Sequence, residues 1–243
     1  MSPMPWMASL LPAVALARAT GPWEIAEPGM ASRPLTMMAV LAALSLGPFA
    51  MMMLTSFAKM TVVLSLARSA MGTQQAPPTM ILTGLAAILT AHVMAPVAER
   101  MYLAGEAASA HVESGADLLA AARATAEPLR EFLLRHASPE ERVRFADLAR
   151  ELRSPEEARM VSDEDLSVIV PAFAITELGE ALHIGFLVFL PFLVLDMLVA
   201  NVLLALGMQS LSPTQVSLPF KILLFVAVDG WALLARGLIL GYR

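Results

Sequence analysis

Long apolar stretches separated by polar connections dominate the pattern of this 243-residue chain. The four longest run from Leu35 to Phe57, Met80 to Val97, Leu182 to Leu206 and Ile222 to Leu240. Each has about 18–25 residues, the length that a helix needs to cross ~30 Å of hydrocarbon. They are too long for strands, and they are rich in Leu, Ala and Met without regular alternation. The pattern therefore predicts an all-α, membrane-associated protein.

The apolar stretches form two pairs, and each pair is predicted to be a helical hairpin. The first pair is joined by Gly72–Pro78, whose diproline suits the first turn of the following helix. The second pair is joined by Gly207–Pro213, which carries no charge. A short apolar run near the N-terminus, Leu10–Ala17, loosely resembles a signal sequence. No Lys or Arg precedes it, so cleavage and retention both remain open.

A polar segment separates the two hairpins. Within it, Ser138-Pro-Glu-Glu141 and Ser154-Pro-Glu-Glu157 each place Ser at a helix cap, Pro at the first helical position and Glu at the third. We expect a solvated, ion-paired helical insert. The predicted organisation is an N-terminal segment at 1–34, a first apolar helical hairpin at 35–97, the polar helical insert at 98–165 and a second apolar helical hairpin at 166–243.

Composition and charge support the membrane prediction. Hydrophobic residues make up 58% of the chain and the mean hydropathy is +0.69, whereas soluble domains are about 45–50% apolar. Of the 37 charged residues, 24 lie between Glu99 and Asp165, so the rest of the chain is nearly free of charges that would be costly in hydrocarbon. The net charge of −5 and the lack of a dense basic run argue against binding to nucleic acid.

Four charged residues lie inside or at the edge of apolar stretches: Lys59, Asp196, Lys221 and Asp229. Because a charge facing lipid is costly, we expect these to be buried charges that pair and hold helices together during assembly. An ion or proton pathway is the alternative. If the second hairpin turns near Ser212, Asp196 and Lys221 lie at levels about 10 Å apart. A direct pair then requires a kink, for which Pro219 is a candidate, or a neighbouring subunit.

The sequence proposes no chemical reaction. The absence of Cys excludes thiolate chemistry and Cys-ligated metals. Glu180-Ala-Leu-His183 matches the Glu-x-x-His pattern of di-metal bundles, but such a site needs a second copy, which this chain lacks. There is no nucleophile with a plausible base and no phosphate-binding loop. We therefore expect no enzymatic activity, no cofactor and no metal site.

Two regions resemble the FliP/SctR family, the export-gate proteins of flagellar and virulence type III secretion systems. The first runs from Thr55 to Pro78 and continues at His92–Val97. The second runs from Pro171 to Asp196 and continues at Ser217–Trp231, where Leu-Pro-Phe-Lys is followed by Val-Asp-Gly-Trp, a specific signature. Both regions occur in the order that the family shows.

The resemblance implies a role that composition alone does not. It implies an oligomeric pore assembly in the bacterial inner membrane, of about five copies. Two smaller membrane proteins, FliQ/SctS-like and FliR/SctT-like, complete a helical cone through which unfolded polypeptides are exported. The weak signal sequence favours the virulence branch. A small-solute or ion transporter is the alternative function, although the two hairpins are unalike and transporters often contain matching repeats.

The resemblance also identifies a pore loop. In the family, methionines between the last two helices form a gasket in the pore, and the corresponding residues here are Gly207, Met208, Gln209, Ser210 and Leu211. One methionine matches, and Gln209 and Ser210 depart from the pattern, so the seal would depend on Met208 and Leu211. The alternative is that the loop packs against a partner.

Charge placement suggests a topology. Lys59 and Arg68 flank the first connection and favour its placement on the cytoplasmic side. The polar insert is then periplasmic. Arg236 and Arg243 favour the opposite orientation for the C-terminus.

Overall fold

A computed structural model describes residues 34–73, 76–109, 115–208 and 210–243 of the chain. The chain divides into two units, Met1–Pro48 and Phe49–Arg243. The signal-like run at Leu10–Ala17 lies outside the described residues. Every regular element within them is a helix, which confirms the all-α prediction. In chain order these helices are α3 (Pro34–Met53), α4 (Phe57–Ala70), α5 (Thr79–Ser109), α6 (Gly115–His136), α7 (Pro139–Glu151), α8 (Pro155–Ala158), α9 (Leu166–Ala205), α10 (Pro213–Ala227) and α11 (Gly230–Leu240).

Two of the described helices, α5 and α9, are long and apolar enough to cross a membrane. Two broken pairs pass the same test when each is taken as one span. These are residues 45–53 of α3 with α4, and α10 with α11. Between α10 and α11 the chain turns by 58°. The four apolar stretches of the sequence therefore correspond to at most four spans, two of them broken.

The helix limits differ from those predicted. The stretch Leu35–Phe57 is interrupted after Met53, and α4 begins at Phe57. The expected limit between first hairpin and insert, at residue 97, falls inside the continuous helix α5. Helix α9 begins at Leu166, where the second hairpin was predicted to begin, and not at the apolar stretch that starts at Leu182. It has 40 residues, which makes it about 60 Å long. It is therefore longer than a bilayer crossing requires.

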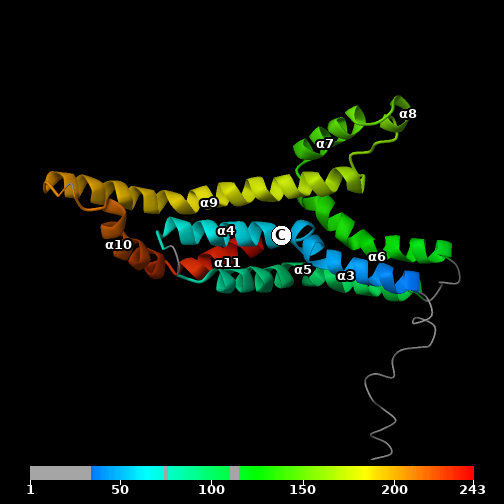
Figure 1. Cartoon of the computed structure of the whole chain (residues 1–243), viewed down its shortest axis with the longest axis horizontal. Coiled ribbons are helices and arrows are strands. Elements are labelled where there is room, and N and C mark those ends of the chain that lie inside the picture. The colour runs from blue at the N-terminus through cyan, green and yellow to red at the C-terminus, as the bar shows by residue number, and fades with distance from the viewer. Residues whose placement is uncertain (1–33, 74–75, 110–114, 209) are drawn as a thin grey trace, which may run out of the picture. The chain divides into compact units, whose positions relative to one another are not determined.

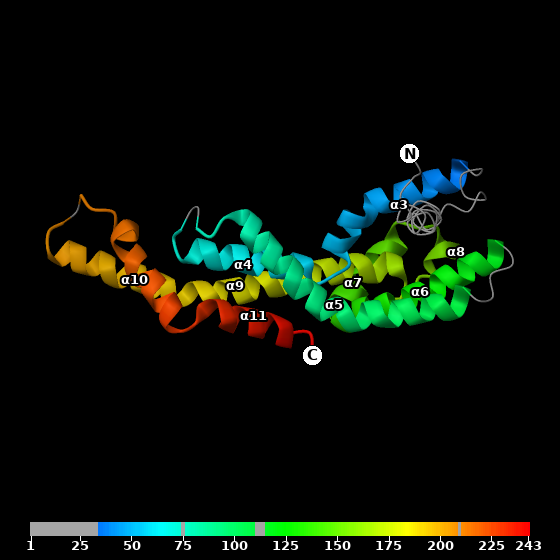
Figure 2. The same ribbon diagram turned by 90° about the horizontal axis from the view of Figure 1, so that it is seen from below.

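In the second unit, α9 is the element around which the others pack. Figures 1 and 2 show α4 lying along its middle, while α10 turns back from its C-terminal end. Helices α6 and α7 contact α9 on the side of its N-terminal end, and α5 packs against both α4 and α6. This arrangement brings α4, the polar insert and the second apolar hairpin together along one helix.

The main core lies on one face of α4. Met60, Val63, Leu64 and Ala67 have no exposed surface, and their spacing of three and four residues places them on one stripe of the helix. They pack with residues of α5, α9, α10 and α11. On α9, Gly185 lies so close to Leu66 that an added Cβ would overlap the leucine side chain. The absence of a side chain at Gly185 therefore permits the close packing of α4 on α9.

The polar insert is helical and ion-paired, as expected. Helix α7 begins at Pro139 after Ser138, and α8 begins at Pro155 after Ser154. The backbone N–H of Ser154 donates to Glu157 Oε2, as the predicted cap requires, and Ser154 Oγ donates to the same carboxylate oxygen. A second core cluster, containing Phe132, Leu133, Ile169 and Phe173, joins α6 to the start of α9. The insert is thus fixed to the apolar helices by hydrophobic contacts.

Candidate functional site

Lys59, on α4, is the centre of a buried ionic cluster. Its ammonium group lies 2.7 Å from Glu180 Oε2 and 3.1 Å from Glu177 Oε1, both on α9. The side chains of Lys59 and Glu177 are 3% and 1% exposed, whereas that of Glu180 is 54% exposed. Because Glu177 and Glu180 are three residues apart on a helix, they can face the same neighbour. One buried cation thus faces two carboxylates, one of which reaches solvent.

Tyr242, next to the C-terminal residue, completes this cluster. Its hydroxyl donates a hydrogen bond to Glu177 Oε2, and Lys59 Nζ lies 4.2 Å from the centre of its ring. The ring also stacks on Phe132, with centroids 6.0 Å apart, and meets His136 edge-on at 5.0 Å. The cluster therefore connects α4, α6, α9 and the end of the chain.

The surroundings of the cluster shift the pKa values of Tyr242 and His136. Burial raises the pKa of Tyr242 above its ordinary value, and the nearby Glu177 carboxylate raises it further. Burial lowers the pKa of His136, and the charges of Lys59 and Arg135 add to this effect, while Glu180 opposes it. Tyr242 therefore keeps its proton and remains a donor, and His136 is neutral at neutral pH.

Asp196 and Lys221 form a second ionic site within the same chain. Lys221 Nζ donates to Asp196 Oδ2 at 2.6 Å, and Ser217 Oγ donates to Asp196 Oδ1. Lys221 is buried, whereas Asp196 is 32% exposed. Neither a neighbouring subunit nor a shift of about 10 Å is needed to form this pair.

The predicted mismatch was wrong because α9 ends at Ala205 and α10 begins at Pro213, so the turn is not a single point at Ser212. Asp196 lies nine residues before Ala205, and Lys221 lies eight residues after Pro213. The two charges are therefore at nearly the same level along the two helices, since each residue adds only about 1.5 Å.

Asp229 does not belong to either buried site. It is exposed and lies at the break between α10 and α11, with φ 51° and ψ 50°. Asp is one of the few residues that tolerate this left-handed conformation. The next residue, Gly230, lies so close to the ring of Phe225 that a Cβ there would overlap it. In the single chain Asp229 is exposed and the helix breaks there, so its burial between subunits of an assembly stays a prediction.

The predicted pore loop follows α9. Gly207 has φ +72°, which favours glycine, and the backbone N–H of Met208 donates to Leu203 O at 2.9 Å. Met208 and Leu211 are each 43% exposed, and Ser210 is also exposed. Gln209 lies outside the described residues. The apolar side chains that the sequence selected are thus accessible at the end of the α9–α10 hairpin.

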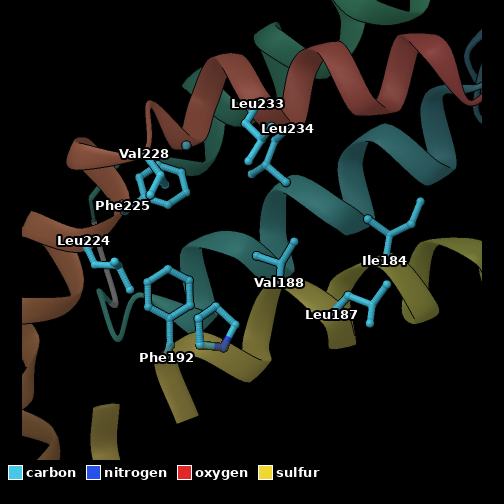
Figure 3. A pocket seen from close by; sticks show the side chains of 11 residues that line it. Ile184, Leu187, Val188, Phe192, Leu224, Phe225, Val228, Leu233 and Leu234 are labelled. Carbon is cyan, nitrogen blue, oxygen red and sulfur yellow. The ribbon is translucent and has the colours of Figure 1, made fainter. Parts of the chain in front are cut away.

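An apolar groove of about 340 Å³ lies between α9 and the broken pair α10–α11. Figure 3 shows Ile184, Leu187, Val188 and Phe192 on one side and Leu224, Phe225, Val228, Leu233 and Leu234 on the other. The groove forms where the chain bends between α10 and α11. Its lining is suited to apolar side chains or lipid.

Glu177 and Tyr242 were missed as members of a charged cluster by the sequence analysis. Glu177 lies inside the predicted second hairpin at 166–243, but only the charges in or beside the longest apolar stretches were considered, and the nearest of these stretches begins at Leu182. The spacing of Glu177 and Glu180 on an extended helix would have been the available signal. Glu180, considered for a metal pattern with His183, pairs with Lys59 instead. No group of three or more His, Asp or Glu side chains in the described part of the chain is placed to hold a metal ion.

The chain is similar over most of its length to known secretion and flagellar proteins. Residues 40–238 match the model of the FliP family. The hypersensitivity response secretion protein HrcR of Ralstonia nicotianae is 45% identical over 219 residues, covering 86% of this chain and 97% of the relative. The Yop proteins translocation protein R of Yersinia pestis is 44% identical over 206 residues, covering 84% and 94%. The flagellar biosynthetic protein FliP of Caulobacter vibrioides is 39% identical over 236 residues, covering 97% and 86%.

Proposed function

Because the chain belongs to the FliP family, we propose that it is a core pore subunit of a bacterial type III secretion export apparatus. With partner subunits it forms the gate through which unfolded proteins are exported. The observation that carries this proposal is the uncharged connection after α9, which exposes Met208 and Leu211 at the end of a long apolar helix. Its role is structural, and it requires no chemical step.

The virulence branch is the better assignment. The two secretion relatives named above are 45% and 44% identical to this chain over 97% and 94% of their own length. Flagellar relatives are 38–44% identical, and the one that is 44% identical is matched over 75% of its own length. Identity and coverage taken together support a virulence rather than a flagellar system.

Assembly with other chains is supported by the apolar surface of α9. Only 11% of its most apolar window is buried within the chain, although apolar surface in contact with water is unfavourable. Lipid, further copies and smaller helical partners would remove this surface from water. We propose about five copies, together with FliQ/SctS-like and FliR/SctT-like membrane proteins.

The closed gate would be made by the loop at residues 207–211. Repeated around a central axis, the exposed side chains of Met208 and Leu211 form a ring of apolar groups. Such a ring excludes water and ions when it is closed, and the flexible thioether of methionine deforms around a passing polypeptide. The gate would therefore seal without a rigid fit.

The proposed location is the bacterial inner membrane, with the polar insert in the periplasm. Lys59 is buried and paired, so it contributes little to orientation. Arg68 remains the basic residue at the first connection, where its guanidinium donates to Thr79 Oγ1 at 2.9 Å. Under the positive-inside rule this connection is cytoplasmic, which leaves the insert on the other side.

The test of the pore proposal compares two double variants in cells that express the assembled complex. Met208→Ala with Leu211→Ala removes the proposed seal, and Leu152→Ala with Met160→Ala is the matched control. The control residues are exposed apolar side chains of the insert, 87% and 79% accessible. We expect the loop variant to raise uptake of a small dye severalfold, while native mass spectrometry shows unchanged assembly for both variants.

Two results would contradict the proposal. Normal assembly with unchanged dye uptake in the loop variant would show that residues 207–211 are not the seal. A wild-type chain that is purified as a monomer and still supports secretion would exclude the pore subunit itself.

A further inference from the structure

One face of α11 is left uncovered by the residues that the structure describes. Leu233, Arg236, Gly237 and Leu240 are exposed, and their spacing of three and four residues places them on one stripe of the helix. The opposite stripe packs into the main core. Asp229 lies at the start of the exposed stripe, because its carbonyl accepts a hydrogen bond from Leu233 N at 3.0 Å. The face therefore combines apolar and small residues with one acidic and one basic residue.

The two charges of this face are unpaired within the described part of the chain. Neither Asp229 nor Arg236 makes an ion pair or a side-chain hydrogen bond with any residue that the structure describes. They are seven residues apart, which is about 10 Å along the helix, whereas charges that pair along a helix are three or four residues apart. Each charge is thus available to a group on another chain.

Neither lipid nor water suits this face of α11. Two unpaired charges are costly in lipid. In water the apolar surface is unfavourable, because Leu233 is 63% and Leu240 is 46% exposed. Leu233 also lines the apolar groove between α9 and the pair α10–α11, as Figure 3 shows, so the apolar surface continues into that groove. A protein partner with both apolar and charged side chains suits the face at any depth of α11 relative to the bilayer.

The small residues of the face leave room for a second helix. Gly237 and Gly241 are four residues apart, a spacing that lets two helices approach closely. A Cβ added at Gly237 would meet nothing within 4 Å. The α11 of a second copy is a poor occupant, because two identical faces that pair with each other close as a dimer. Such a contact does not repeat around the single axis that is proposed for about five copies.

We propose that this face of α11, with the adjoining groove, binds one helix of a smaller membrane partner. That helix carries a basic side chain opposite Asp229 and an acidic side chain opposite Arg236. The inference rests on the proposed function, which supplies such partners. Apolar contacts provide the attraction, and the two charges select the partner and fix its direction, since the reverse direction would place like charges opposite each other.

Site-specific cross-linking in the assembled complex identifies the occupant. The chain is coexpressed with its FliQ/SctS-like and FliR/SctT-like proteins, Leu233 is replaced by a photoreactive phenylalanine analogue, and the mass of the cross-linked product is measured. Leu148, which is 45% exposed on α7, carries the same analogue as the control. We expect position 233 to cross-link to one of the two small partners and position 148 to give no such product. A product with a second copy of this chain, or no product at position 233, would overturn the inference.

Two variants test the contact itself by native mass spectrometry of the complex. Gly237→Leu fills the space left for the partner, and Arg236→Gln removes one charge. Both should lower the content of the small partner severalfold, whereas Arg236→Lys should retain most of it. Gly84→Leu is the control, because Gly84 is exposed on α5 and a Cβ there also meets nothing within 4 Å. Leucine is a better helix former than glycine, so neither leucine variant should unfold at a lower temperature than wild type.

The wild-type complex separates two kinds of failure. If it contains neither small partner, the proposed function is wrong and this inference falls with it. If it contains them and Gly237→Leu keeps the full partner content, the inference alone is wrong, and the export role stands.

Discussion

At the scale of single residues, the buried charges are held by partners that come from distant parts of the chain. Lys59 meets Glu177 and Glu180, and Glu177 in turn accepts a hydrogen bond from Tyr242. An isolated buried charge is too costly to persist. The buried Glu177 carboxylate therefore depends on the Lys59 ammonium group, and Lys59 depends on its carboxylate partners. The arrangement explains why a lysine is compatible with an otherwise apolar helix face.

Removal of one partner from this cluster should be far more damaging than removal of both. Lys59→Met leaves the buried Glu177 without its cation, and we expect a loss of about 3–5 kcal/mol in the free energy of unfolding. The double variant Lys59→Met with Glu177→Gln should recover part of this loss. Thermal unfolding in detergent measures both, with Arg144→Met as the control for an exposed pair, expected to change stability by less than about 0.5 kcal/mol.

A second residue-level prediction concerns pH. The pKa of His136 is lowered by burial and by the charges of Lys59 and Arg135. When the pH falls below the ordinary pKa of 6.5, the unfolded chain therefore binds a proton at His136 more readily than the folded chain does. The stability that neutral His136 contributes is therefore present above pH 6.5 and is lost as the pH falls through the folded-state pKa. Glu177, Glu180 and Tyr242 also face this region, and Glu180 opposes the shift without reversing it.

The variant His136→Gln removes this titration. Its unfolding temperature should fall less than that of wild type between about pH 7.5 and pH 5.5. His183→Gln, at an exposed position of α9, should keep the wild-type pH dependence. Identical pH profiles for wild type and His136→Gln would show that another group controls acid stability.

At the scale of helices, apolar length predicted the elements well but not their ends or breaks. The four stretches and both Ser-Pro caps correspond to observed helices. The start of the second hairpin at residue 166 was predicted, but the apolar stretch alone begins only at Leu182, because polar residues such as Glu177 and Glu180 interrupt the hydrophobicity of α9 while Lys59 on α4 pairs with them. Likewise, α10 and α11 are separated at Asp229, beside which Gly230 lies against the Phe225 ring. Such tertiary contacts leave no regular period in the sequence.

The packing of α4 on α9 gives a prediction with an internal control. Gly185→Ala places a Cβ against the Leu66 side chain, and we expect a loss of about 1–3 kcal/mol through overpacking. Gly179→Ala, on the same helix, meets nothing within 4 Å, and should be neutral or stabilising by up to about 1 kcal/mol. Thermal unfolding compares the two variants. Equal effects at both positions would mean that the close approach at Gly185 does not determine how the helices pack.

At the scale of the whole molecule, sequence and structure constrain different things. Family motifs indicated the export role, and the structure explains how one chain satisfies most of its own intramembrane charges through Lys59–Glu177 and Asp196–Lys221. Assembly is therefore expected to depend on the apolar surfaces of α9 and the groove beside α10–α11 more than on unpaired charges. The orientation in the membrane follows from neither packing nor hydrophobicity, because a helix bundle can be inserted in either direction. It depends on the few basic residues at the connections.

Orientation can be tested with single introduced cysteines, because the chain contains none of its own. Arg144→Cys lies on the insert at a position that is 66% exposed, and Ala76→Cys lies on the exposed part of the first connection. A membrane-impermeant maleimide should label Arg144→Cys when the outer membrane alone is opened, since the insert is proposed to be periplasmic. Ala76→Cys should react only after the inner membrane is also permeabilised, because Arg68 favours the cytoplasmic side for that connection. The reverse labelling order would assign the insert to the cytoplasm, and it would show that Arg236 and Arg243 at the C-terminal end outweigh Arg68 in setting the topology.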